Sequence, residues 1–62
     1  MYYVLLTWVL HREQEFDGGV SVHGTVEEVD GDKFDTLDEA TERLVEYLQA
    51  DPGADIWIAE RG

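Results

Sequence analysis

The chain has 62 residues, no cysteine, four lysines and arginines together, and fifteen aspartates and glutamates, which give it a net charge of −11. This charge disfavours direct binding to DNA, RNA or anionic membranes, and the lack of cysteine excludes disulfides, thiolate zinc sites and cysteine nucleophiles. A chain of this length is expected to form a single small acidic domain, residues 1–62, with room for little more than one sheet and one helix.

The first predicted element is a strand over residues 2–11, YYVLLTWVLH, which is rich in aromatic and β-branched residues. Apolar residues occupy both its odd and its even positions, which is typical of a central strand contacted on two faces. The run lacks the preceding basic residue and the following cleavage site of a signal peptide, and it is shorter than the ~20 apolar residues of a membrane helix. We therefore expect a cytoplasmic protein with no membrane partner.

A hairpin is predicted to join this strand to a second strand over residues 20–29, VSVHGTVEEV. Between them, Asp17, Gly18 and Gly19 suit the positive φ angles of a tight turn. A three-residue Asp-Gly-Gly loop pairs Val26 with Leu10, whereas a two-residue loop shifts every pair by one. The three-residue loop is favoured because it gives the core the larger apolar set, which consists of Val4, Leu6, Trp8, Leu10, Val20, Val22 and Val26.

A helix is predicted over residues 36–50, TLDEATERLVEYLQA. Thr36 followed three residues later by Glu39 fits a capping box, and Pro52 favours an end at the preceding residues. Helical spacing gathers an apolar stripe that consists of Leu37, Ala40, Thr41, Leu44, Val45 and Leu48.

The last predicted element is a short strand over residues 55–60, DIWIAE. A crossover through the helix would lay this strand against the free edge of the first strand. The predicted fold class is therefore α+β: a single ββαβ domain whose three-stranded antiparallel sheet has the order 2-1-3, with one helix packed on one face.

One helix covers only one face of such a sheet, so the other face is expected to be open. An exposed apolar patch usually marks an interaction surface, here with a partner or with a second copy in a homodimer, although a small domain can also carry an apolar face with no partner. In the favoured register the residues predicted to form this surface are Tyr3, Leu5, Val9, His23 and Trp57.

Acidic residues are concentrated in residues 27–42, EEVDGDKFDTLDEATE, which hold eight of the fifteen. On the predicted helix, Asp38, Glu42 and Glu46 follow at a spacing of four, where like charges destabilise a helix by roughly 0.2–0.5 kcal/mol per pair, and only Glu39 with Arg43 forms a favourable pair. Helix stability therefore does not explain the row. We define the acidic ridge as Glu27, Glu28, Asp30, Asp32, Asp35, Asp38, Glu42 and Glu46.

The first interpretation of the acidic ridge is mimicry of nucleic-acid phosphates. Carboxylates held on a helix and its flanking loop would block the basic groove of a DNA- or RNA-binding protein. In size, charge and layout, although in no motif, the chain resembles small acidic inhibitors encoded by phages, including anti-CRISPR and other anti-defence proteins. That resemblance implies an inhibitor that acts in the cytoplasm of the host cell.

Two other interpretations stay open. The ridge could be a solvated face in a small dimeric structural domain of a salt-adapted organism, with no inhibitory role. It could also bind calcium, because Glu28, Asp30 and Asp32 fall at liganding positions of an EF-hand loop. Lys33 stands where that loop needs glycine, however, so no metal site is predicted.

Catalytic chemistry has little support in the sequence. His11 and His23 are expected to lie near each other across the hairpin and with Glu13 could offer three metal ligands, but such histidines are more often surface residues. Ser21 is the only serine and has no nucleophile elbow around it, and no glycine-rich loop precedes the helix. We therefore expect no enzyme activity, no catalytic residue, no cofactor and no metal.

Overall fold

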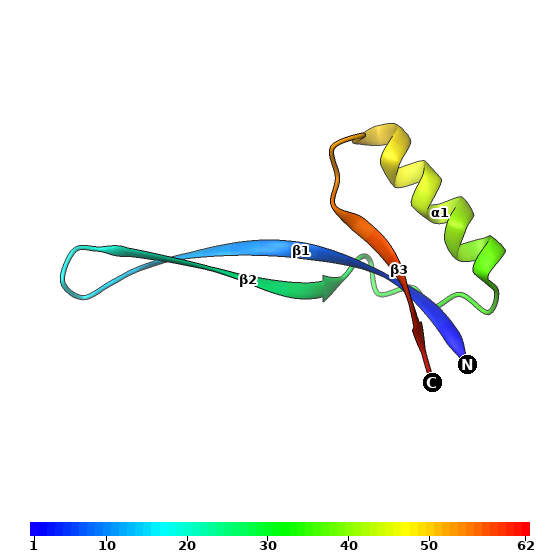
Figure 1. Ribbon diagram of the computed structural model, residues 1–62, viewed down its shortest axis with the longest axis horizontal. Coiled ribbons are helices and arrows are strands. Elements are labelled where there is room, and N and C mark those ends of the chain that lie inside the picture. Colours follow the sequence, from blue (N-terminus) through cyan, green and yellow to red (C-terminus); the bar gives the residue numbers. More distant parts are fainter.

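A computed structural model describes all residues from Met1 to Gly62. Its elements follow in the order β1 (Tyr2–Gln14), β2 (Val20–Glu28), α1 (Leu37–Ala50) and β3 (Ile56–Arg61). The strands form one antiparallel sheet in the order β2-β1-β3, as Figure 1 shows. The predicted ββαβ fold and sheet order are thus confirmed.

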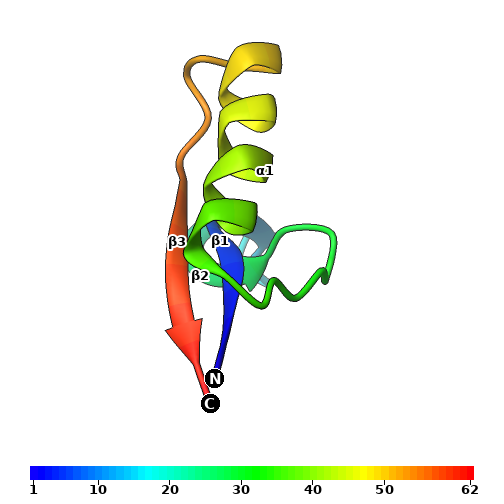
Figure 2. The same ribbon diagram turned by 90° about the vertical axis from the view of Figure 1, so that its right-hand side faces the viewer.

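The molecule consists of a small body and a long arm. β3 pairs with β1 only from Tyr2 to Thr7, and α1 packs against β1 and β3 but not against β2. The rest of the hairpin, residues 8–26, extends beyond both elements as a two-stranded arm (Figures 1 and 2). The Cα radius of gyration is 15.0 Å, whereas a compact domain of this length has about 10.6 Å.

The hairpin turn differs from the predicted one by two residues in register. Glu15 donates its N–H to the carbonyl of Gly19 at 2.8 Å, so the loop consists of residues 16–18. A three-residue loop needs a positive φ at its third position, and Gly18, with a φ of 89°, occupies it. Val26 therefore pairs with Trp8 rather than with Leu10.

The helix covers the face of the sheet opposite to the predicted one. Cross-strand partners share a face, so the pairing of Leu5 with Ile58 places both on one side. On that side, Leu5 and Ala40 of α1 are fully buried and pack with Phe34, together with the partly buried Tyr3, Val29, Leu44, Tyr47, Ile56 and Ile58. We call this the helix-side face and the opposite one the open face.

Helix length explains why most of the larger apolar set did not become the core. Only Val4 and Leu6 of that set are buried. The valines of β2 lie along the arm, whereas α1 has 14 residues and is about 21 Å long. The helix can cover only the sheet segment next to β3, within a molecule 48 Å long. There, Ile56 and Ile58 are on the helix-side face and supply the apolar surface.

The connection from β2 to α1 keeps the chain close to the sheet. Tyr3 and Phe34 exchange two backbone hydrogen bonds of 2.8 Å, which extend the pairing along β1 beyond the end of β2. Thr36 then caps the helix by accepting the N–H of Glu39 at 3.2 Å, as predicted. Asp51 ends it with a hydrogen bond from its N–H to the carbonyl of Tyr47.

Candidate functional site

Arg43 organises the central part of the acidic ridge. Its guanidinium lies 2.7 Å from Asp32 Oδ2, 3.1 Å from Asp30 Oδ2 and, through Nε, 3.5 Å from Glu46 Oε2. It also lies over the ring of Phe34, with its Cζ 5.5 Å from the ring centroid. One cation on α1 therefore ties the β2–α1 loop to the helix and gathers three carboxylates around it.

Tyr47 adds a second tie between the helix and the loop. Its hydroxyl donates a hydrogen bond to Asp30 Oδ2, and this bond is the main reason why the pKa of Tyr47 lies above its ordinary value. The pKa of Arg43 is also raised, chiefly by its hydrogen bond to Asp32 and against the opposing effect of desolvation. Asp30 itself has a φ of 49°, a left-handed conformation that aspartate tolerates better than most residues.

The remaining members of the acidic ridge are not all neighbours. Asp35, in the loop before α1, and Asp38 and Glu42, in the first two turns of α1, are exposed and form no ion pair within the chain. Glu27 and Glu28, adjacent in β2, point to opposite faces of the sheet. The structure thus brings three of the eight predicted residues, Asp30, Asp32 and Glu46, together around Arg43, and it points the two in β2 to opposite faces.

The sequence prediction missed the contacts of Arg43 and Tyr47 with the β2–α1 loop. The spacing of these two residues along the helix is the only sequence signal for them. Arg43 and Tyr47 are four residues apart and so share one face of α1. The prediction paired Arg43 with Glu39, but Arg43 bonds to the loop carboxylates instead. Nothing local in the sequence shows that the loop folds back over this face.

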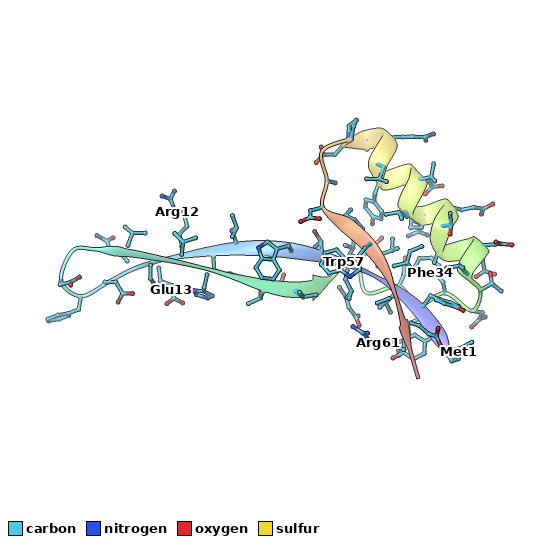
Figure 3. All side chains as sticks on the ribbon, in the orientation of Figure 1. Met1, Arg12, Glu13, Phe34, Trp57 and Arg61 are labelled. Atoms are coloured by element: carbon cyan, nitrogen blue, oxygen red, sulfur yellow. The ribbon has the colours of Figure 1, made fainter.

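The open face has a different membership from the predicted one. Tyr3, Leu5, Val9 and His23 all lie on the helix-side face, where Leu5 is fully buried, so their predicted placement is wrong. Of the five predicted residues, only Trp57 lies on the open face, where it pairs with Leu6 (Figure 3). The exposed apolar residues on this face are Trp8, Leu10, Val20, Val22, Val26 and Trp57.

These six residues line one side of the sheet from the body to the tip of the arm. Their shared face follows from the pairing of Val26 with Trp8, of Val22 with Arg12 and of Trp57 with Leu6. The prediction had already placed the valines of β2 and the even-numbered residues of β1 on one face. It assigned that face to the core, which is correct for Val4 and Leu6 and wrong for these exposed residues.

The helix-side face of the arm is polar by contrast. His11 and His23 pair directly across the hairpin, as predicted, with stacked rings whose centroids are 5.4 Å apart. His11 Nε2 also lies 2.9 Å from Thr25 Oγ1 and 3.6 Å from Glu27 Oε1. No group of three potential metal ligands occurs anywhere in the protein.

The surface has a single hollow, and it lies on α1 beside Arg43 and Tyr47. It has a volume of about 330 Å³ and is lined by Arg43, Glu46, Tyr47 and Ala50. It is open to solvent, and its charged lining groups Arg43 and Glu46 are already paired with each other. The candidate functional sites are therefore the two exposed surfaces, the acidic ridge and the open face, and not this hollow.

The single helix, α1, has neither the length nor the apolarity needed to cross a membrane. No protein family, no curated protein and no solved structure matches this chain.

Proposed function

We propose that this protein is an acidic binding module that occupies the basic groove of a DNA- or RNA-binding protein, with the acidic ridge in the place of nucleic-acid phosphates. The observation that carries the proposal is the uneven distribution of acids between the two sides of the molecule. Of the acids in the three strands, Glu13, Glu27 and Glu60 lie on the helix-side face and only Glu28 lies on the open face. The others belong to α1 and the loops.

Rigidity of the helix and loop supports this function. A mimic gains affinity when its charges are already in place, because less conformational freedom is lost on binding. The Arg43 and Tyr47 contacts fix the β2–α1 loop on the helix. We call these contacts of Arg43 and Tyr47 with the loop the clamp. Asp35, Asp38 and Glu42 form no ion pairs and are the charges most available to a basic partner.

The proposed partner is a nucleic-acid-binding protein of the cytoplasm, the class that phage anti-defence and anti-CRISPR inhibitors block. Attraction between an acidic ridge and a basic groove accelerates association at low ionic strength and weakens as salt screens it. Duplex DNA would compete for the same groove. Competition by DNA and sensitivity to salt are therefore the two properties that distinguish mimicry from ordinary protein binding.

The test compares two variants that each remove three charges. The ridge variant carries Asp35→Asn, Asp38→Asn and Glu42→Gln, and the control carries Glu13→Gln, Glu15→Gln and Asp17→Asn near the tip of the arm. Each is immobilised and exposed to a nuclease-treated bacterial lysate, and bound proteins are then eluted with a short DNA duplex. We expect DNA to release proteins from the wild type and the control but not from the ridge variant. Equal capture by both variants, or no release by DNA, contradicts the proposal.

A structural role in a salt-adapted organism is the second candidate, and the exposed apolar residues of the open face favour it. In such a protein, screening of the −11 charge by salt would be a condition for folding. Urea unfolding at low and at molar salt separates the candidates. A chain that folds only in molar salt supports the structural role, and one that is equally stable at low salt contradicts it.

A further inference from the structure

The open face carries most of the exposed large apolar residues of the molecule. Its six exposed apolar residues, from Trp57 at 37% to Leu10 at 66%, lie along one side of the sheet. Together they expose an area on the order of 600 Å², at the top of the range of ~300–600 Å² for the largest apolar patch of a typical monomer. The total accessible surface, 4626 Å², also exceeds the roughly 4,100 Å² expected at 7.1 kDa.

The arm has nothing within the chain to hold it. α1 makes no packing contact with β2, and β3 ends its pairing with β1 at Thr7. Two strands without a third strand or a packed helix are marginally stable in water. Contact of the apolar side of the arm with another molecule would therefore stabilise the arm.

Three charged residues of the strands, Arg12, Glu28 and Arg61, lie on the open face. The first two indicate what provides the cover. Arg12 pairs with Val22 toward the tip of the arm, and Glu28 pairs with Leu6 at its base. Neither residue forms an ion pair within the chain. From Leu6 to Arg12 the distance along β1 is about 20 Å at ~3.3 Å per residue. A positive and a negative charge thus lie at opposite ends of the same apolar surface. Figure 3 shows Arg12 and its neighbour Glu13 on opposite sides of the arm, as the alternation of side chains along a strand requires.

We propose that the open face binds a second copy of this chain. A two-fold axis between Trp8 and Leu10 would stack the arms face to face and antiparallel, which places Trp8 of each copy against Leu10 of the other. The same operation brings Arg12 of each copy opposite the Leu6–Glu28 pair of the other, within reach of the Glu28 carboxylate, so the surface is complementary to itself, as an isologous interface requires. Stacked sheets lie ≈10 Å apart, a gap that arginine and glutamate side chains can bridge together.

Size and charge both favour this occupant. The apolar area with its rim of Arg12, Gln14 and Glu28 approaches the ≈800 Å² per partner of a standard interface. Acids elsewhere on the molecule would repel a second copy, but of the acids in the strands this face carries only Glu28. The open face is therefore the side on which two copies with a charge of −11 each can approach most closely.

The first test introduces a lysine into the interface and, as a matched control, into the helix. Val26 on the open face and Val45 on α1 are exposed to 48% and 45%. Sedimentation velocity of the wild type, Val26→Lys and Val45→Lys over a range of concentrations measures the dimer dissociation constant. Because the lysine would be buried in the dimer, Val26→Lys should raise this constant roughly 100-fold or more, and Val45→Lys should leave it unchanged.

The second test uses charge exchange and does not depend on burying a lysine. Arg12→Glu places two acids opposite each other, and Glu28→Arg places two cations opposite each other, so each variant alone should dimerise more weakly than the wild type. Mixing the two variants restores opposite charges at both contacts, and we expect heterodimers to form. Circular dichroism of each variant verifies that its fold is intact.

Three results would overturn the inference. They are a wild type that sediments as a monomer at about 1 mM, a dimer that survives Val26→Lys because it forms through the free edge of β3, and single charge variants that do not recover when mixed. The ridge variant leaves Glu28, the one ridge residue on this face, unchanged. The dimer and the proposed inhibitory function can therefore fail independently.

Discussion

At the scale of single residues, Gly24 shows how the open face of the arm is built. A Cβ atom at this position would lie 2.1 Å from Cζ2 of Trp8, so the indole occupies the space that any side chain at residue 24 would need. Trp8 nevertheless remains 49% exposed. Glycine in β2 therefore lets the indole lie against the backbone of the sheet.

We predict that Gly24→Ala displaces the Trp8 indole and lowers the free energy of unfolding by about 1 kcal/mol, as overpacking does. Urea unfolding followed by tryptophan fluorescence measures both effects. Gly53→Ala is the control, because a Cβ there would meet only Asp51 Oδ1 at an ordinary 3.6 Å. Unchanged stability and emission in Gly24→Ala would show that Trp8 does not lie against this glycine.

Tyr47 makes stability depend on alkaline pH. Its hydrogen bond to Asp30 raises the pKa of the hydroxyl above the ordinary value of 10.0. A group whose pKa is raised by folding stabilises the fold below its unfolded pKa, and this contribution is lost as the pH rises through the folded pKa. The Tyr47 contribution should thus be complete below about pH 10 and absent well above it.

Tyr47→Phe should therefore lower the urea midpoint at neutral pH but not at strongly alkaline pH. Parallel unfolding curves of the wild type and the variant from pH 7 upward measure the difference between them. A difference that persists unchanged above the folded pKa would mean that packing of the ring, and not the hydroxyl, stabilises the fold.

At the scale of elements, β1 is buried on both faces within the body, at Val4, Leu5 and Leu6, and is exposed on its open face along the arm. Leu5 on the helix-side face is fully buried, whereas Leu10 on the open face is 66% exposed. Leu5→Ala should lower the free energy of unfolding by about 2–5 kcal/mol, which is most of the stability of so small a domain. Leu10→Ala should change it by less than about 0.5 kcal/mol at concentrations where the protein is monomeric. The reverse order, measured by urea unfolding, would place the core on the other face.

The clamp between the β2–α1 loop and the helix gives a second prediction at this scale. Arg43→Met should speed hydrogen exchange in the loop, from Asp30 to Lys33, because the loop carboxylates lose their shared cation. Arg61→Met is the control, since Arg61 bonds only to the carbonyl of neighbouring Glu60. Equal loop exchange in both variants would show that Arg43 does not hold the loop.

Local patterns predicted the elements well because each depends on nearby residues. The Thr36 cap, the helical spacing after it and the strand composition of residues 2–11 all have structural counterparts. The register was wrong by two residues, because the prediction placed the three-residue loop at residues 17–19, one position beyond the loop of residues 16–18. A shift of two preserves the faces, so the valines still lie beside Trp8.

The choice of the covered face could not be made from local patterns. β1 is apolar at both odd and even positions, so either side could have become the core. Counting apolar residues favoured the side with the valines and ignored where the helix could reach. The structure places the helix where β3 brings Ile56 and Ile58, and the membership of both candidate surfaces follows from that placement.

At the scale of the whole molecule, the two sides of the sheet have opposite character. The helix side carries the clamp, the exposed acids of α1 and the polar face of the arm, and the open face carries the exposed apolar residues. An acidic side for a basic partner and an apolar side for a second copy can act together, because the two surfaces share only Glu28. A dimer would present two acidic ridges.

Intrinsic fluorescence tests the central claim, that the apolar side of the sheet is left for a second copy to cover, most directly. Both tryptophans, Trp8 and Trp57, lie on the open face and are partly exposed, so the emission reports on this face alone. As the protein concentration rises, we expect the emission to shift to shorter wavelength and acrylamide quenching to weaken in the wild type and in Val45→Lys, but not in Val26→Lys. Emission and quenching that stay constant in the wild type up to about 1 mM would contradict the claim.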